Sequence, residues 1–362
     1  MDYIDVQKFD FFGEKKKDFY RKFSVESVLV QGKHRQKAPM VTIVLTTYKR
    51  PGLLKQALES ALNQVDFEDY QIIVADNEGV DINTETETAK LVSGYQDEKI
   101  LYYRHVKTID FKMDYAARLA RSKWICFMHD DDILASNHLM AMSGIVREHQ
   151  KIKFLSCTFK TFYDEISEEA FREMTAPRRG ACQIRKYPRA YTCLGYYPGW
   201  LGAFIDRKAY ISTGGIPTLS TGIGDYCMVG KFMYRYGVYE MKAGVPLYLR
   251  RAWSGQATAT DIWKRLYAME YHYHVYMTKK YHKLFRDVWN RLSAYRIISK
   301  YENFMKSRNR PREDLEEFAV EAGMGPGALE KGKQYAKDMV WQMVYEGIAE
   351  KLSFPVKYNG RI

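Results

Sequence analysis

The sequence predicts an α/β protein whose mostly parallel sheet is flanked by helices. Apolar runs rich in β-branched residues at 40–47, 70–75 and 124–129 are typical of strands buried on both faces. A helical repeat of apolar residues separates the first two runs and begins near Pro51, a residue favoured in the first turn of a helix. Strands that alternate with helices form parallel sheets through crossover connections, and this pattern gives the fold class.

The other elements follow in order along the chain. We expect strands at 100–104, 152–159 and 244–250, and helices at about 51–62, 84–95, 113–120, 136–149 and 229–236. A polar, acidic turn is predicted between 160 and 175, and the basic, proline-punctuated stretch 178–189 is predicted to be an exposed loop or flap. We divide the chain into an N-terminal arm (1–38) that packs on the main domain, the main domain (39–258) and a C-terminal basic helical region (259–362).

The composition limits the class of protein. A chain of 362 residues with 46% hydrophobic and 28% charged residues is globular and long enough for a large domain with an appendage. It contains no apolar run long enough to span a bilayer and no apolar signal segment, so we expect a cytoplasmic protein. The five cysteines show no metal-ligand spacing and are expected to be reduced thiols. A formal charge of +12 implies an anionic partner.

Polar residues follow three of the predicted strands at the points where the strands end. Thr46 follows the first strand, Asp76 the second, and His129-Asp-Asp-Asp132 the strand at 124–129. Ligands of open parallel sheets bind at the carboxyl ends of the strands, so these residues converge on one crevice. Three adjacent carboxylates at the end of a buried strand need a cation, and we expect a divalent metal site there rather than a solvated acidic turn.

Three motifs at these strand ends resemble those of the family 2 glycosyltransferases of GT-A fold. They are Thr42-Ile-Val-Leu-Thr-Thr-Tyr-Lys-Arg-Pro51, Ile72-Ile-Val-Ala-Asp-Asn77 and Phe127-Met-His-Asp-Asp-Asp132, and both their order and their spacing agree with the family. The resemblance covers about residues 40–255. It implies a Rossmann-like GT-A domain that transfers a sugar from a nucleotide diphosphate donor, most commonly a UDP-sugar, with inversion and with Mg²⁺ or Mn²⁺.

The resemblance also implies roles for residues of the first two motifs. Thr46, Thr47 and Tyr48 would contact the nucleoside of the donor, and Asp76 would accept a hydrogen bond from the base. A carboxylate that accepts from an imide N–H makes a charge-assisted bond, which is consistent with this role. For the neighbouring cations Lys49 and Arg50, contact with the phosphates and simple solvation both remain open.

The same resemblance implies that the acidic motif binds the metal ion. Asp131 aligns with the main metal ligand of the family, and Asp130 with a contact to the ribose or to a metal-bound water. Asp132 is a second ligand or a helix N-cap. His129 departs from the family pattern, which usually begins with aspartate, and is either a further ligand or a structural residue.

Three further positions are assigned on the acceptor and phosphate sides. Asp225, at the start of a predicted helix, aligns with the general base of the family, although Gly224 replaces the glutamate that usually precedes it. Its alternative role is that of a helix N-cap. Arg250 and Arg251 are candidate clamps for the diphosphate, because arginine forms bidentate bonds with phosphate.

Three other residues are notable for their positions. Trp200 either stacks on a sugar ring or belongs to the core, and Gly202 allows a close approach of the backbone. Asp114 stands where many relatives carry asparagine, so the family assigns it no role.

The C-terminal region is basic and helical. Leu284, Val288 and Leu292 recur every fourth residue among lysines and arginines, which predicts a long basic amphipathic helix, with further helices at 312–322 and 334–350. This helix either lies on an anionic membrane, at the inner face where lipid-linked acceptors reside, or presents a solvated face. The histidines of Tyr271-His-Tyr-His274 diverge on a helix and are not expected to bind metal.

These observations predict an inverting, metal-dependent glycosyltransferase that acts on a glycan or lipid-linked acceptor in the synthesis of a surface or capsular polysaccharide. The alternative is a catalytically silent scaffold that binds a nucleotide-sugar. Nucleic-acid binding is not expected, because only the net charge favours it. A dinucleotide-binding dehydrogenase is disfavoured, because no glycine-rich G-x-G-x-x-G turn follows the first strand.

Overall fold

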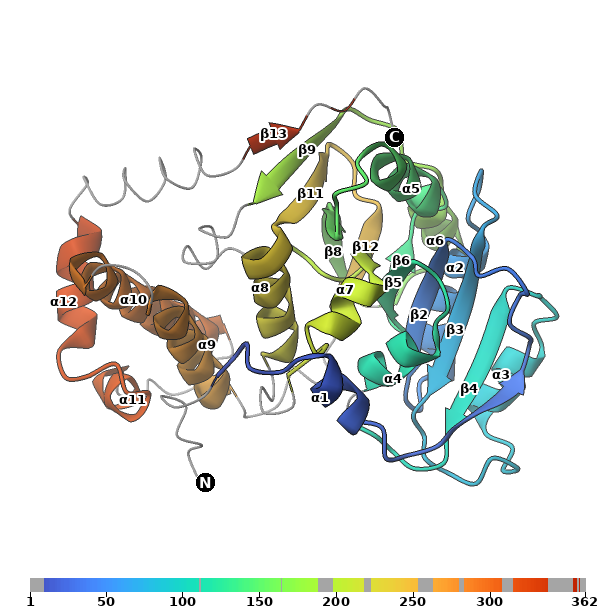
Figure 1. Ribbon diagram of the computed structural model, residues 1–362, viewed down its shortest axis with the longest axis horizontal. Helices are drawn as coiled ribbons and strands as arrows, with labels where there is room; N and C mark the ends of the chain where they lie inside the picture. Colours follow the sequence, from blue (N-terminus) through green and yellow to red (C-terminus); the bar gives the residue numbers. More distant parts are fainter. Residues whose placement is uncertain are drawn as a thin grey trace.

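The computed structural model describes residues 10–110, 112–163, 165–187, 198–217, 223–252, 263–279, 283–307, 315–337, 354–356 and 358. A ten-stranded sheet in the order β1-β4-β3-β2-β5-β10-β7-β11-β9-β13 forms its centre (Figure 1). The strands are β1 (Ser27–Gln31), β2 (Val41–Thr47), β3 (Tyr70–Asp76), β4 (Ile100–His105), β5 (Trp124–His129), β7 (Phe154–Cys157), β9 (Cys182–Tyr187), β10 (Phe204–Asp206), β11 (Val238–Ala243) and β13 (Phe354–Val356). The predicted α/β class with a mostly parallel sheet is confirmed.

The central strands end together at one edge of the sheet. Every residue of β2 and β3 is buried, as the unbroken runs of Val, Ile and Leu require. Strand β2 lies parallel to both β3 and β5, with Thr47 opposite Asp76 and Thr46 opposite His129. This register places the three polar strand ends side by side, as the sequence predicted.

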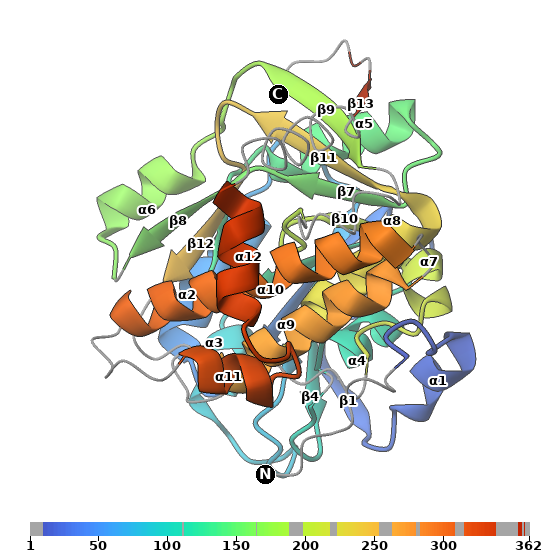
Figure 2. The same cartoon turned by 90° about the vertical axis from the view of Figure 1, so that its left-hand side faces the viewer.

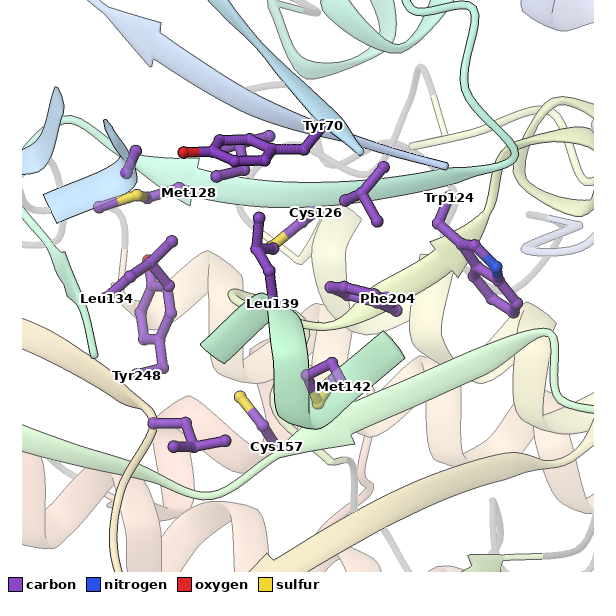
Figure 3. Packing of buried hydrophobic residues seen from close by; sticks show 14 of the residues in the cluster. Tyr70, Trp124, Cys126, Met128, Leu134, Leu139, Met142, Cys157, Phe204 and Tyr248 are labelled. Atoms are coloured by element: carbon purple, nitrogen blue, oxygen red, sulfur yellow. The ribbon is translucent and has the colours of Figure 1, made fainter. Parts of the chain in front are cut away.

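Helices cover both faces of the sheet. They are α2 (Pro51–Leu62), α3 (Glu87–Ser93), α4 (Lys112–Leu119), α5 (His138–Glu148), α7 (Arg207–Ser212) and α8 (Gly224–Tyr236). Leu139 and Met142 of α5 pack against Cys126, Met128 and Phe204 in one core layer (Figure 3). A second layer on the other face includes α4, α7 and α8. Pro51 is the first residue of α2, as predicted.

A separate three-stranded sheet adjoins the end of β5. Its strands are β6 (Ile133–Leu134), β12 (Tyr248–Ala252) and β8 (Phe159–Tyr163), in the order β6-β12-β8. Helix α6 (Glu168–Thr175) covers one face of this sheet, where its Phe171 packs on a small core that contains Phe162 and Leu249. The sheet therefore has one covered face and one face that is open to the cavity described below.

The N-terminal arm packs on the main domain and also extends its sheet. Phe19 of α1 (Lys16–Arg21) is buried against the core, and β1 pairs antiparallel with β4. Lys22 follows α1, and its side chain is almost fully buried. Its ammonium group donates to Asp114 of α4 at 2.7 Å and to the carbonyl of Gly214 at 2.7 Å. Asp114 thus has a structural contact that ties the arm to the core.

Three sequence predictions in the second half of the domain are wrong. The turn expected between 160 and 175 contains α6, which Ser167 caps by accepting from the N–H of Ala170. Residues 182–187, expected in a loop, form β9, because Ile184 and Tyr187 face the core between basic residues. The single strand expected at 152–159 is two strands, β7 and β8, because the chain passes from one sheet to the other at Thr158.

The C-terminal region forms four described helices, α9 (Trp263–Thr278), α10 (Lys283–Ser307), α11 (Leu315–Glu321) and α12 (Ala328–Lys337), which lie together beside α8 (Figures 1 and 2). The predicted apolar stripe is displaced: Val288 and Leu292 are half-buried, whereas Ile297, Ile298 and Tyr301 pack between the helices. The side chain of Leu284, and the predicted helix beyond residue 337, lie outside the described residues.

No helix in the described ranges is both long enough and apolar enough to cross a membrane.

Candidate active site

The turn after β2 carries the first group of predicted residues. The hydroxyl of Thr47 donates to Asp130 at 2.7 Å, and the hydroxyl of Thr46 points to the sulfur of Met113 at 3.7 Å. Both threonines are buried, whereas Tyr48 is exposed. Lys49 has a left-handed backbone with φ of 53°, which turns the chain back toward the sheet edge. The turn therefore brings Thr47 to the acidic motif and leaves Tyr48 on the surface.

Asp76 lies at the end of β3 and is buried. Its carboxylate accepts from the hydroxyl of Tyr102 at 2.7 Å and from the N–H of Glu78 at 2.9 Å, and Arg104 lies 3.7 Å away. Burial raises the pKa of Asp76 above its usual range. These protein contacts fix the carboxylate at the same sheet edge as Thr47.

The three carboxylates of the acidic motif have different partners. Asp130 is fully buried and lies 2.6 Å from the guanidinium of Arg50, which also contacts Asp131 at 3.4 Å. Asp132 accepts from the hydroxyl of Tyr248 at 2.5 Å and from the backbone N–H of Arg251 at 2.8 Å. Burial raises the pKa of Asp132 to about 7, and the neighbouring charge of Asp131 adds to this effect.

The donor set of the motif fits a divalent cation. Ligand atoms of His129, Asp131 and Asp132 lie within 4.8 Å of one another. Burial lowers the pKa of His129 to about 4, so its imidazole is neutral at pH 7 and can act as a ligand. Carboxylate and imidazole ligands together suit ions such as Mn²⁺. Because both oxygens of Asp132 already accept hydrogen bonds, Asp131 and His129 are the more accessible ligands.

The two arginines of β12 lie on opposite sides of the strand. Arg250 is exposed, and its guanidinium lies 5.7 Å from the ring of Phe159. Arg251 is 2% exposed, donates to the carbonyl of Asp131 at 2.9 Å and to Gln56, and therefore lies beneath the carboxylates. This placement corrects the expectation that both arginines face the diphosphate, since neighbouring residues of a strand point to opposite faces.

Lys112 is a cation near the motif that the sequence did not single out. It is the first residue of α4 and is half-buried. Burial lowers its pKa, while the charges of Asp130 and Asp131 act in the opposite direction. Its position depends on the packing of α4, so no local pattern could have identified it.

A cavity of about 380 Å³ is lined in part by Trp200 and Tyr248, which contact His129 and Asp132 of the acidic motif, respectively. Asp225 lines it together with Arg250 and several aromatic side chains. The indole N–H of Trp200 donates to Asp225 at 3.0 Å, and the edge of the Trp200 ring lies against His129 with the centroids 5.7 Å apart. Trp200 therefore connects the acidic motif to Asp225 across the cavity wall.

Asp225 lies in the first turn of α8 and does not cap it, because the N-cap residue is Ile223. One of its carboxylate oxygens accepts from the N–H of Tyr226 at 2.8 Å, and the other accepts from Trp200. Burial raises the pKa of Asp225, which strengthens it as a base.

One residue of the C-terminal helices belongs to the same cavity wall. Lys300 of α10 lines the cavity and donates to Glu270 of α9 at 2.6 Å. Glu270 in turn accepts from the hydroxyl of Tyr226 at 3.3 Å, and His274 lies 3.4 Å from the same hydroxyl. Sequence reasoning missed Lys300, because nothing local distinguishes it from the other lysines of α10.

Gly202 allows another part of the protein to approach its backbone closely, as the sequence predicted. It has φ of +71°, and a Cβ atom at this position would lie 2.4 Å from the ring of Tyr248. The glycine thus leaves room for the tyrosine that holds Asp132.

Comparisons with known proteins agree with this geometry. The sequence profile of glycosyl transferase family 2 matches residues 42–197. A curated relative, the GalNAc(5)-diNAcBac-PP-undecaprenol beta-1,3-glucosyltransferase of Campylobacter jejuni, is 27% identical over 124 residues. That match covers 33% of this chain and 38% of the relative, so the alignment spans little more than a third of the relative's length.

Solved structures show the likeness in fold. The structure of S. aureus TarS 1-349 in complex with UDP-GlcNAc superposes with a TM-score of 0.57 at 13% identity and covers 86% of this chain and 91% of that one. Another crystal structure of TarS 1-349 gives a TM-score of 0.54 at 12% identity and covers the same shares of the two chains. Residues 42–197 are therefore similar to glycosyl transferase family 2, and the chain shares the GT-A fold.

Proposed function

We propose that this protein is a glycosyltransferase that moves a sugar from a UDP-sugar, with inversion and with Mn²⁺ or Mg²⁺, to a glycan or lipid-linked acceptor. The observation that carries the proposal is the contact of Trp200 with both His129 of the acidic motif and Asp225, which lines the neighbouring cavity. The substrates named for TarS and for the Campylobacter enzyme support a UDP-sugar donor and a lipid-linked acceptor, respectively. A role in polysaccharide synthesis at the inner face of the membrane is consistent with such an acceptor.

The donor would lie along the edge formed by the ends of β2, β3 and β5. Asp76 would accept a hydrogen bond from the base, and the exposed ring of Tyr48 would cover the nucleoside. Thr46 and Thr47 would form the floor of this edge, and Asp130 would contact the ribose. These roles are the ones that the family resemblance implies.

Asp131 and His129 would hold the cation, with Asp132 behind them as a further acidic group. A bound divalent cation would act as a Lewis acid and neutralise charge on the diphosphate. Arg250 adds a cation on the open side of the motif, whereas Arg251 supports the motif from beneath. We therefore retain Arg250 and not Arg251 as the candidate contact to the diphosphate.

Asp225 would act as the general base. An acceptor hydroxyl in the cavity attacks the anomeric carbon from the side opposite the diphosphate, and its proton passes to the carboxylate of Asp225. The bond between the anomeric carbon and the diphosphate oxygen breaks at the same time, and the nucleoside diphosphate leaves. Attack from the opposite side inverts the configuration at that carbon. The contact with Trp200 orients the carboxylate for this step.

The proposal is tested by calorimetric titration with UDP, GDP and CMP, each with and without Mn²⁺. Wild-type protein should bind UDP more tightly with Mn²⁺, and Asp131→Asn should remove this dependence on metal. Asp69→Asn is a matched control, because Asp69 is exposed and remote from the acidic motif in sequence. If no nucleotide binds more tightly with Mn²⁺, the proposed function is wrong.

A second variant separates binding from chemistry. Asp225→Asn should bind UDP and Mn²⁺ within a few-fold of wild type, because Asp225 lies on the acceptor side of the cavity. Sugar transfer, followed by mass spectrometry of products from candidate UDP-sugars and acceptors, should be lost. Transfer at a near wild-type rate would exclude Asp225 as the base.

A further inference from the structure

The open face of the small sheet carries an unusual set of side chains. Strand β8 lies parallel to β12, with Phe159 beside Tyr248, Thr161 beside Arg250 and Tyr163 beside Ala252. Alternate residues of a strand share a face, so these six residues lie on the same side of the sheet. The opposite side is covered by α6, whereas on this side Tyr248 is buried and Phe159, Tyr163 and Arg250 are exposed. We call this side the β8 face.

Two aromatic rings of the β8 face are exposed. Phe159 is 46% exposed and Tyr163 is 72% exposed. A strand with one covered face usually presents polar residues on its other face, so large exposed rings here are informative. Four residues of extended strand place the two rings roughly 13 Å apart. Among the described residues, β8 is the last strand of its sheet, so no strand lies beyond it.

The β8 face continues the wall of the cavity that contains Asp225. Phe159, Tyr248 and Arg250 belong both to the face and to the cavity lining. The guanidinium of Arg250 lies 5.7 Å from the centroid of the Phe159 ring, which is within the range of a cation–π contact. Ala252, beside Tyr163, is small. The face therefore begins at the candidate base and leads outward past Thr161 to Tyr163.

We propose that the β8 face binds sugar residues of an oligosaccharide acceptor, beyond the residue that receives the new sugar. This inference rests on the proposed function, because it uses the cavity as the place where the acceptor hydroxyl reacts. An aromatic ring packs against the C–H face of a sugar ring, while polar groups beside it bond the sugar hydroxyls. Phe159 and Tyr163 supply the rings, and the hydroxyl of Thr161 supplies a polar group between them.

The chemistry of the face favours a glycan over an apolar partner. Thr161 and the cation of Arg250 separate the two rings, so they do not form the contiguous apolar patch that marks a protein-binding core. The distance between them also exceeds one sugar ring, so both can be occupied only by an acceptor of more than one sugar. The β8 face therefore selects for acceptor length.

The test compares the variants Phe159→Ala and Tyr163→Ala with wild type. Tyr20→Ala is the matched control, because Tyr20 is 48% exposed and lies on α1 of the arm. The probes are fluorescently labelled mono-, tri- and pentasaccharides of the GalNAc, N-acetylglucosamine and glucose series. Affinity is measured by fluorescence polarisation with UDP and Mn²⁺ present, and binding of UDP is measured on the same samples.

Wild-type protein should bind the pentasaccharide of at least one series more tightly than the monosaccharide. Tyr163→Ala should weaken pentasaccharide binding by roughly 3- to 10-fold, as expected for the loss of one stacked ring, and leave monosaccharide binding unchanged. Phe159→Ala should weaken binding of both lengths, because Phe159 lines the cavity. Tyr20→Ala should match wild type.

Two results would overturn the inference while UDP binding persists. One is wild-type affinity that does not increase with oligosaccharide length in any series. The other is a Tyr163→Ala variant whose affinity still increases with oligosaccharide length and whose oligomeric state, measured by light scattering, differs from that of wild type. The β8 face would then be a contact between protein copies. If the wild-type protein shows no metal-dependent binding of UDP, the proposed function itself is refuted. The failure of the proposed function is thereby distinguished from the failure of the inference about the β8 face.

Discussion

Replacing Lys22 with methionine removes the cation that contacts a fully buried carboxylate. Lys22 and Asp114 have side chains that are 1% and 0% exposed, and their charged groups lie 2.7 Å apart. Asp114 would keep the hydroxyl of Tyr210 and the backbone N–H of Ile216 as hydrogen-bond donors. Methionine preserves most of the side-chain volume, so the change isolates the charge and its hydrogen bonds.

The expected loss of stability follows from this burial. Two unit charges 2.7 Å apart attract by about 6 kcal/mol at an effective dielectric constant of 20. Removing Lys22 also removes its own desolvation cost, and broken buried pairs typically lose about 3–5 kcal/mol. We expect the free energy of unfolding at pH 8 to fall by that amount. Lys90→Met, which removes an exposed pair with Glu87, should leave the free energy of unfolding close to that of wild type.

The pH dependence gives a second check on the same variant. Burial already raises the pKa of Asp114, and removing Lys22 raises it further. A raised folded-state pKa contributes stability that is present below the unfolded pKa of about 4 and is lost as pH rises through the folded value. The deficit of Lys22→Met should therefore be smaller at pH 5 than at pH 8.

Urea unfolding followed by tryptophan fluorescence measures both quantities. Asp114→Asn combined with Lys22→Met should recover part of the loss, because the buried charge is then absent. A Lys22→Met protein within about 1 kcal/mol of wild type at pH 8 would refute the reasoning. A deficit that is larger at pH 5 would refute its electrostatic part.

Two further predictions concern the cores beside the site. Gly202→Ala should lower the melting temperature by several degrees and weaken metal-dependent UDP binding, since its Cβ would displace Tyr248 from Asp132; Gly52→Ala, with open space around it, should do neither. Burial lowers the pKa of His138 to about 4, so the unfolded state binds more protons between pH 4 and 6.5 and stability falls as pH falls through that window. His138→Phe should remove up to about 3 kcal/mol of the change in unfolding free energy across that pH window. An unchanged dependence of unfolding free energy on pH would contradict this assignment.

The sheet edge was predictable because buried parallel strands have an unmistakable composition. The β-branched runs located β2, β3 and β5, and topology alone then brought Thr46, Asp76 and the acidic motif together. Pairings between distant segments were not predictable in this way. The bond between Trp200 and Asp225, and the position of Lys300, depend on how α8 and α10 pack.

The alternation of side chains along β12 could have been used to separate the roles of its two arginines. Adjacent strand residues face opposite ways, so Arg250 and Arg251 could not both point into the cavity. Only the register of β12 against β8 decides which one does. Strand β9 was hidden for a similar reason, because its buried residues are interleaved with basic ones.

Lys300 of α10 brings the C-terminal region into the wall of the cavity that contains Asp225. The segment that matches the family profile, 42–197, contains the strand ends and the acidic motif, whereas Asp225 and Lys300 come from later segments. Under the proposed function, a chimera that exchanges residues 263–307 with those of another family 2 glycosyltransferase should change which acceptor is used without altering the choice of nucleotide. Acceptor specificity could diversify by such exchange while the donor half of the enzyme stays fixed.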